Sequence, residues 1–179
     1  MKQKIVFIAG IHGVGKTTLC EYLSAELSLK YYSASNLIKE YGKIDFPKSK
    51  HIVNISGNQD VLICAIAEFL EPEKTSILDG HFCLLNENGE ITKIPSSTYI
   101  EMKPQAIICL YEEADVICSR LKNRDKHSHN EKLIGAFQDA EISYAKEIAD
   151  NLEIPICVGK SGEDREKIRD FIIDATKGS

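Results

Sequence analysis

Strand-like apolar runs alternate with segments of helical periodicity along most of the chain. The strand-like runs lie at 5–9, 31–33, 76–79, 106–111 and 154–158. Helices are predicted at 16–27, 35–41, 60–70, 114–123, 129–151 and 163–176. In the first helix, Leu19, Leu23 and Leu27 recur every four residues and share one face. This alternation predicts an α/β fold in which right-handed crossovers join a parallel sheet covered by helices on both faces.

Two segments interrupt the alternation. Residues 82–94 predict a hairpin, because Asn88-Gly89 supplies the positive φ angles that a tight turn needs. Residues 42–57 contain Gly, Pro and Lys and predict an irregular loop. The long helix at 129–151 is expected to bury one stripe, formed by Leu133, Phe137, Ala140, Tyr144 and Ile148.

The composition indicates one globular domain spanning residues 1–179. Hydrophobic residues make up 43% and charged residues 27% of the chain. No run approaches the roughly 18 apolar residues of a membrane span, and the apolar start is too short for a signal peptide. The net charge of −5 argues against non-specific nucleic-acid binding. The cysteines are interpreted as reduced core residues of a cytoplasmic protein: Cys20, Cys64, Cys83, Cys109, Cys118 and Cys157.

The strongest motif is a glycine-rich loop between the first strand and the first helix. Residues 10–17 fit the pattern G-x-x-x-x-G-K-[ST], which binds nucleotide phosphates through backbone N–H groups and the following helix N-terminus. Lys16 would reach the β- and γ-phosphates and the Thr17 hydroxyl would ligate Mg²⁺. The candidate ATP-binding residues are Gly10, His12, Gly13, Val14, Gly15, Lys16, Thr17 and Thr18. A glycine turn with a chance Lys-Thr pair is the alternative, but strand, loop and helix agree on the motif.

A second candidate is the acid that ends the run Ile77-Leu78-Asp79. An acid at the end of a buried strand lies at the carboxyl edge of the sheet, where ligands of open α/β sheets bind. Asp79 would hold Mg²⁺ together with Thr17, directly or through water. The alternative role for Asp79 is to cap the turn before Gly80.

Arg120 and Arg124 lie four residues apart near the end of a predicted helix, so they share one face. Two guanidinium groups one turn apart suit a polyphosphate whose charge grows during transfer. The alternative is that both are cations favoured by the helix C-terminus. The polar segment 125–129 that follows would close over a nucleotide.

These motifs together resemble the nucleoside monophosphate kinase group, in particular the short-lid adenylate kinases of the archaeal type and the adenylate-kinase-like ATPases. The resemblance rests on the glycine-rich loop, on Leu78-Asp79-Gly80-His81-Phe82 and on Arg120-Leu121-Lys122-Asn123-Arg124. It implies a three-layer P-loop NTPase fold with a five-stranded parallel sheet, an acceptor-side insertion at about 34–70 and a short lid at about 120–130. It also implies ATP and Mg²⁺ as ligands, a nucleoside monophosphate as phosphoryl acceptor, and catalysis by Lys16, Asp79 and the two arginines.

The acceptor half departs from the family pattern, because the chain has no arginine before Arg120. Lys39 stands where the family has an acceptor-helix arginine, and lysine cannot hold a phosphate in a bidentate fork. Candidate acceptor-site residues are Lys39, Asn58, Gln59 and His81. Two alternative functions stay open: a kinase of an unphosphorylated small molecule, and an ATPase switch that acts with a protein or RNA partner.

Overall fold

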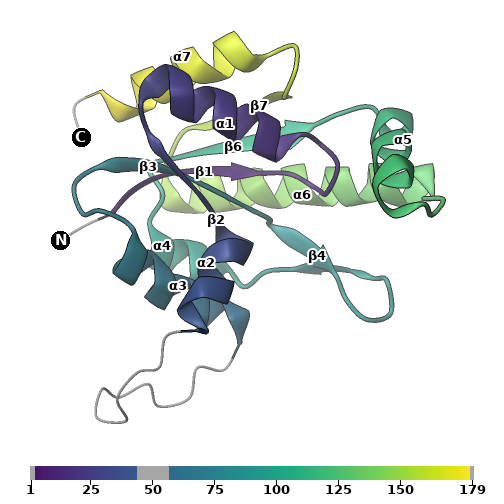
Figure 1. Cartoon of the computed structure of the whole chain (residues 1–179), viewed down its shortest axis with the longest axis horizontal. Helices are drawn as coiled ribbons and strands as arrows, with labels where there is room; N and C mark the ends of the chain where they lie inside the picture. Colours follow the sequence, from purple (N-terminus) through teal and green to yellow (C-terminus); the bar gives the residue numbers. More distant parts are fainter. Residues whose placement is uncertain (1–2, 44–56, 178–179) are drawn as a thin grey trace.

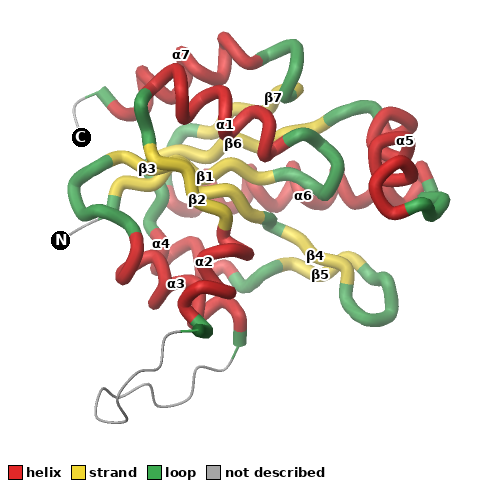
Figure 2. Tube along the Cα trace, in the orientation of Figure 1, coloured by secondary structure: helices red, strands yellow, loops and turns green. Residues whose placement is uncertain are grey.

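The computed structural model describes residues 3–43 and 57–177. Five parallel strands form its main sheet, in the order β2-β3-β1-β6-β7 (Figures 1 and 2). The strands are β1 (Lys4–Ala9), β2 (Lys30–Ser33), β3 (Thr75–Gly80), β6 (Ala106–Tyr111) and β7 (Ile156–Lys160). The parallel sheet predicted from the sequence is confirmed. Of the loop predicted at 42–57, residues 44–56 lie outside the described residues.

Helices cover both faces of this sheet, as predicted. The helices are α1 (Lys16–Leu27), α2 (Ala34–Tyr41), α3 (Asn58–Phe69), α4 (Ser96–Met102), α5 (Ala114–Asp125), α6 (Glu131–Leu152) and α7 (Arg165–Thr176). Figure 1 shows α1 and α7 together on one face and α6 on the other, while α4 lies beside α3 and, with α2, in the group of helices below the sheet. The result is the three-layer P-loop arrangement that the motifs predicted.

The apolar runs are strands because both of their faces are covered. In β1, Ile5, Val6, Ile8 and Ala9 are all fully buried, and Phe7 is 2% exposed. A continuously apolar strand is expected where helices pack on both sides of a parallel sheet. This central strand leads directly into the glycine-rich loop, so the core fixes the position of the loop.

The predicted hairpin is present and stands apart from the main sheet. It pairs β4 (Cys83–Leu85) with antiparallel β5 (Ile91–Lys93). Gly89 in its turn has φ +77°, the left-handed conformation for which the Asn-Gly pair was predicted. Figure 2 shows the hairpin extending away from the carboxyl edge of the sheet.

Two local predictions were wrong, and one helix was not predicted. The last strand begins at Ile156 rather than 154, because its register against β6 runs from Ile107↔Ile156 to Tyr111↔Lys160. Leu133 is 38% exposed, and the buried face of α6 includes Ile134 in its place. The helix α4 (Ser96–Met102) was missed, because it is only seven residues long; it buries Thr98, Tyr99 and Met102.

Within the described residues, no helix combines the length and the apolar character needed to cross a membrane.

Candidate active site at the carboxyl edge of the sheet

The glycine-rich loop has a backbone that only glycine adopts without strain. Gly10, Gly13 and Gly15 have φ angles of +147°, +83° and +103°. At Gly10 a Cβ would also lie 2.9 Å from the Leu110 carbonyl oxygen, so a larger residue would push β1 away from β6. The loop ends where α1 begins at Lys16, and the positive end of that helix therefore faces the loop.

Lys16 is held over this loop by its own backbone. Its Nζ donates to the carbonyl oxygens of Gly10 and Ile11. Burial lowers the pKa of Lys16, while the nearby charge of Asp79 raises it. A largely desolvated ammonium group gains more from a phosphate oxygen than a solvated one does.

Asp79 ends β3 beside the loop and is 7% exposed. The parallel register places it next to Ile8 of β1 on one side and Ser33 of β2 on the other. Its Oδ2 accepts a hydrogen bond of 2.6 Å from the Tyr31 hydroxyl. This phenol is a site residue that the sequence analysis missed.

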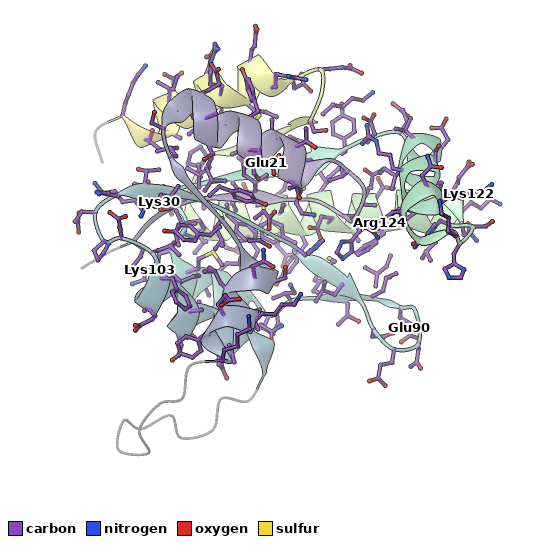
Figure 3. The ribbon with its side chains drawn as sticks, in the orientation of Figure 1. Glu21, Lys30, Glu90, Lys103, Lys122 and Arg124 are labelled. Atoms are coloured by element: carbon purple, nitrogen blue, oxygen red, sulfur yellow. The ribbon has the colours of Figure 1, made fainter. Side chains whose placement is uncertain are left out.

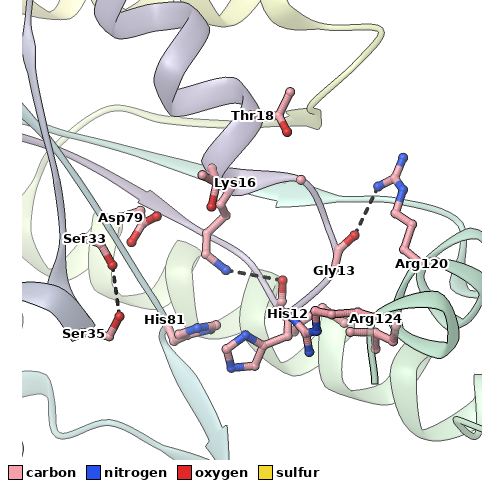
Figure 4. A pocket seen from close by; sticks show the side chains of 14 residues that line it. His12, Gly13, Lys16, Thr18, Ser33, Ser35, Asp79, His81, Arg120 and Arg124 are labelled. Carbon is pink, nitrogen blue, oxygen red and sulfur yellow. Dashed lines mark hydrogen bonds between the residues drawn. The ribbon is translucent and has the colours of Figure 1, made fainter. Parts of the chain in front are cut away.

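A cavity of about 350 Å³ lies over the loop (Figure 4). It brings together ten of the residues singled out from the sequence: His12, Gly13, Gly15, Lys16, Thr17, Thr18, Asp79, His81, Arg120 and Arg124. Ser33 and Ser35, which are not among the predicted site residues, also line it. The cavity is therefore rich in backbone donors, cations and hydroxyl groups, which is the chemistry that binds phosphates.

Arg120 reaches the loop from α5. Its Nη1 donates to the carbonyl oxygens of Gly13 at 3.2 Å and Val14 at 3.4 Å, and its Nη2 pairs with Glu112 Oε2 at 3.2 Å. Arg124, one turn further along α5, lines the same cavity (Figures 3 and 4). Both guanidinium groups thus lie where the shared helix face predicted them.

The segment after β7 closes the other side of the loop. Ser161 Oγ donates to the Val14 carbonyl oxygen at 3.1 Å. The neighbouring Lys160 forms ion pairs with Glu113 at 3.1 Å and Glu112 at 3.7 Å. Nothing in the local sequence pattern marks this segment, because Val14 lies 147 residues from Ser161 and Glu113 lies 47 residues from Lys160 along the chain.

A second cavity of about 280 Å³ adjoins the first. The two share four residues: His12, Ser35, Asp79 and His81. The second cavity is mostly apolar, and its walls include Phe7, Ile38, Leu62, Tyr99 and Met102. It is therefore suited to a flat or apolar group whose polar end points back toward the loop.

Of the predicted acceptor residues, Gln59 and His81 line this second cavity. Lys39 lies on the exposed side of α2 and lines neither cavity. The side chain of Asn58 lies outside the described part of the structure. Thr98, which the sequence analysis missed, lines the second cavity with a hydroxyl that has no hydrogen-bond partner among the described residues.

The two histidines pack against each other where the cavities meet. The ring centroids of His12 and His81 lie 4.6 Å apart. Burial is the largest cause that lowers the pKa of both rings, with the Lys16 charge next, and the pKa of His81 falls far below its usual range. Both rings line both cavities, so they lie at the boundary between them.

This fold and this site define the class of P-loop kinases. The chain belongs to the AAA domain family, whose model matches residues 9–134. The resemblance to the nucleoside monophosphate kinase group is confirmed by the relatives described next.

Two archaeal proteins with the name "Putative adenylate kinase" match almost the whole chain. The one from Methanocaldococcus jannaschii is 28% identical over 180 residues, covering 96% of this chain and 85% of that protein. The one from Pyrococcus furiosus is 28% identical over 176 residues, covering 95% and 82%. Human adenylate kinase isoenzyme 5 is 27% identical over 136 residues, covering 71% of this chain and 23% of that protein.

Solved structures of kinases share the fold at low sequence identity. Shikimate kinase from Acinetobacter baumannii, in complex with shikimate, has a TM-score of 0.59 and 14% identity, with 98% of this chain and 96% of that chain covered. A gluconokinase from Sinorhizobium meliloti 1021 has a TM-score of 0.51 and 12% identity, with 97% and 90% covered. These likenesses establish the fold alone.

Proposed function

We propose that this protein is an ATP- and Mg²⁺-dependent kinase that transfers the γ-phosphoryl group to a nucleoside monophosphate. One observation carries the proposal: the phosphate-binding cavity and the apolar cavity share His12, Ser35, Asp79 and His81. A donor held over the loop and an acceptor held in the apolar cavity would therefore meet at the same four residues. The adenylate-kinase names of the two archaeal relatives support this choice of acceptor.

The donor side follows from the loop. Backbone N–H groups, the N-terminus of α1 and Lys16 would hold the phosphates, and the cavity over the loop also contains Arg120 and Arg124. Such a transfer needs little covalent help from the protein, so positioning and charge stabilisation would supply most of the catalysis. The two arginines are the groups best placed to stabilise the charge that develops on the transferring phosphoryl group.

Thr17 and Asp79 are the residues that would hold Mg²⁺. One hydroxyl and one carboxylate are oxygen ligands of the kind Mg²⁺ takes alongside substrate phosphates, and both line the cavity over the loop. When bound, Mg²⁺ would neutralise charge on the phosphates. The hydrogen bond from Tyr31 supports this role, because it would fix the orientation of the Asp79 carboxylate.

On the acceptor side, the apolar walls would enclose the base. Apart from the four residues shared with the first cavity, Gln59 and the unpartnered Thr98 hydroxyl are the polar groups at these walls that would bond its edge. The acceptor phosphate would then lie toward the cavity over the loop, where Lys16 and Arg124 supply positive charge.

A second candidate function is a kinase whose acceptor carries no phosphate. The observation that favours it is the composition of the apolar cavity, which is lined by neither lysine nor arginine among the described residues. An uncharged acceptor needs no such cation. In that case Asp79 or the neutral His81 would orient the attacking hydroxyl.

The decisive experiment compares each nucleoside monophosphate with the corresponding nucleoside as the phosphoryl acceptor. Purified protein would be incubated with ATP and Mg²⁺, first alone, then with each common nucleoside monophosphate or deoxynucleoside monophosphate, and then with the corresponding nucleosides. Products would be separated by anion-exchange chromatography, with Lys16→Ala as the blank. A diphosphate formed from one monophosphate, and absent with Lys16→Ala, is the expected result.

The other possible results would favour other functions. Phosphorylation of a nucleoside but not of its monophosphate would replace the proposal with the second candidate. ADP and free phosphate without any phosphorylated acceptor would contradict both, and would favour an ATPase that works with a protein or RNA partner.

A further inference from the structure

Helix α6 carries two buried polar side chains one turn apart, on the face that packs under the sheet. Gln138 is 8% exposed and Glu141 is fully buried. Both bond to backbone groups just beyond the carboxyl ends of strands. Gln138 holds the Glu112 backbone after β6: its Oε1 accepts from the Glu112 N–H at 2.9 Å and its Nε2 donates to the Glu112 oxygen at 2.8 Å.

Glu141 joins two different strand ends. Its Oε1 accepts from the N–H of Gly10, after β1, at 3.2 Å and from the N–H of Phe82, after β3, at 2.9 Å. Its Oε2 accepts from the N–H of Cys83 at 2.6 Å. Burial raises the pKa of Glu141, while these three bonds and the charge of Lys16 lower it. An ionised carboxylate only accepts hydrogen bonds, and three N–H donors match that capacity.

The backbone segments that bond to Glu141 also accept hydrogen bonds from other side chains near the two cavities. The Gly10 carbonyl oxygen accepts from Lys16. The carbonyl oxygen of His81, which belongs to the same peptide group as the Phe82 N–H, accepts from the Tyr99 hydroxyl at 2.6 Å. Glu141 and Lys16 therefore bond to the same residue, Gly10. Glu141 is also linked to His81, because the N–H of Phe82 belongs to the peptide group that joins His81 to Phe82.

We propose that Glu141 is a positioning residue for phosphoryl transfer, because its carboxylate sets the spacing between the glycine-rich loop and the His81 segment. The loop would hold the donor and His81 lies where the acceptor cavity begins, so this spacing is the distance between the two reactants. The inference rests on the proposed function. A misplacement of about 1 Å between reacting groups can lower a rate on the order of 100-fold.

The variant Glu141→Gln tests this assignment with almost no change of shape. An amide retains one acceptor oxygen but turns an N–H group toward one of the three backbone donors. The matched control is Ser24→Ala, which removes a 2.6 Å hydrogen bond from Ser24 to the Leu29 oxygen at the far end of α1. Both variants lose hydrogen bonding inside the fold, but only one of them touches the strand ends that form the site.

Three readouts would be compared below the melting temperatures of both variants: kcat with the acceptor found above, the dissociation constant for ATP, and the NMR ring-proton signals of His12 and His81. For Glu141→Gln we expect kcat to fall on the order of 10- to 100-fold. The ATP dissociation constant should change less than kcat, and the ring signals should shift. Ser24→Ala should keep the wild-type kcat and ring signals, whatever its melting temperature.

The proposal is overturned if Glu141→Gln matches Ser24→Ala in kcat and in the histidine signals, since a purely structural carboxylate would lower only the melting temperature. If Glu141→Gln does not fold, Glu141→Asp replaces it, because it keeps a carboxylate but shortens its reach to the three N–H groups. If the wild type phosphorylates no acceptor, the proposed function fails and with it the role of Glu141 in phosphoryl transfer; unchanged ring signals would then also show that its carboxylate does not position the His81 segment.

Discussion

The hydroxyl of Tyr31 donates a hydrogen bond of 2.6 Å to Oδ2 of Asp79. Tyr31 lies on the edge strand β2, two residues before Ser33, which is the register partner of Asp79. Burial raises the pKa of the phenol, and its bond to Asp79 raises it further, so the hydroxyl keeps its proton and remains a donor. The bond occupies one carboxylate oxygen and fixes the direction of the other.

We therefore predict that Tyr31→Phe weakens activation by Mg²⁺. Groups that orient a metal ligand typically contribute tenfold or more to metal affinity, so the Mg²⁺ concentration for half-maximal activity should rise about tenfold. The measurement is a Mg²⁺ titration of turnover at saturating ATP.

Tyr32→Phe is the matched control, since the Tyr32 hydroxyl donates to the Phe69 oxygen at 3.4 Å and lines neither cavity. Its Mg²⁺ dependence should equal that of the wild type. An unchanged Mg²⁺ titration in Tyr31→Phe would show that the phenol does not orient the metal site.

A second prediction concerns the geometry of Arg120. Its guanidinium spans the Gly13 and Val14 carbonyl oxygens and Glu112, which a compact ammonium group cannot do. Arg120→Ala should lower kcat on the order of 100-fold, the usual cost of losing one group that stabilises developing charge. Arg120→Lys should restore little of that loss.

The control is Lys122→Ala, on the exposed side of the same helix (Figure 3). Steady-state kinetics of the three variants make the comparison. If Arg120→Lys has wild-type kcat, positive charge alone is sufficient and the planar fork is not needed.

The sequence predicted the parts of the site that depend on near neighbours along the chain. The loop from Gly10 to Lys16 needs glycines, a preceding apolar strand and a following helix, and all of these lie within a short segment. The position of Asp79 followed in the same way, because a buried strand that ends in an acid brings that acid to the carboxyl edge.

The missed residues act through contacts between distant parts of the chain. Tyr31 lies 48 residues from Asp79, Glu141 lies 131 residues from Gly10, and Ser161 lies 147 residues from Val14. In α6 the apolar periodicity was read correctly at Phe137 and Tyr144, but two polar residues share that buried face. Their partners are backbone groups at strand ends, and those become visible only when the sheet is assembled.

A third prediction tests the acceptor cavity. Thr98 is 4% exposed, and its hydroxyl has no partner among the described residues. If the acceptor bonds to it, Thr98→Val should raise the KM for the acceptor about fivefold, the effect of one ordinary hydrogen bond. The KM for ATP should not change. The free energy of unfolding should stay equal or rise, because the variant removes an unsatisfied buried hydroxyl.

Thr92→Val is the control, since Thr92 lies in the exposed hairpin and its hydroxyl bonds to the nearby Glu90 oxygen at 3.4 Å. Kinetics in both substrates and urea unfolding would be measured for the two variants. An acceptor KM that is the same in Thr98→Val and wild type would remove Thr98 from the acceptor site.

The last prediction concerns the reactivity of the cysteines, all six of which are free thiols. Cys20, Cys83 and Cys109 are fully buried and Cys157 is 7% exposed, whereas Cys64 and Cys118 are only partly buried.

Burial raises the pKa of the Cys83 thiol to about 11, and it raises the pKa of the Cys20, Cys109 and Cys157 thiols as well. Since the thiolate is the reactive form, a raised pKa lowers reactivity at any pH below it.

Brief alkylation of the native protein at pH about 8 should therefore modify Cys64 and Cys118 before the other four, which should react only after unfolding in guanidinium chloride. Burial also raises the pKa of the Cys118 thiol, so Cys118 should react more slowly than a free thiol. Mass spectrometry of peptides identifies the modified residues, and a Cys64→Ser, Cys118→Ser double variant serves as the control. Rapid native labelling of Cys20 or Cys109 would contradict the prediction, because those thiols lie on the buried face of α1 and in β6, where a reagent has no access unless the core opens.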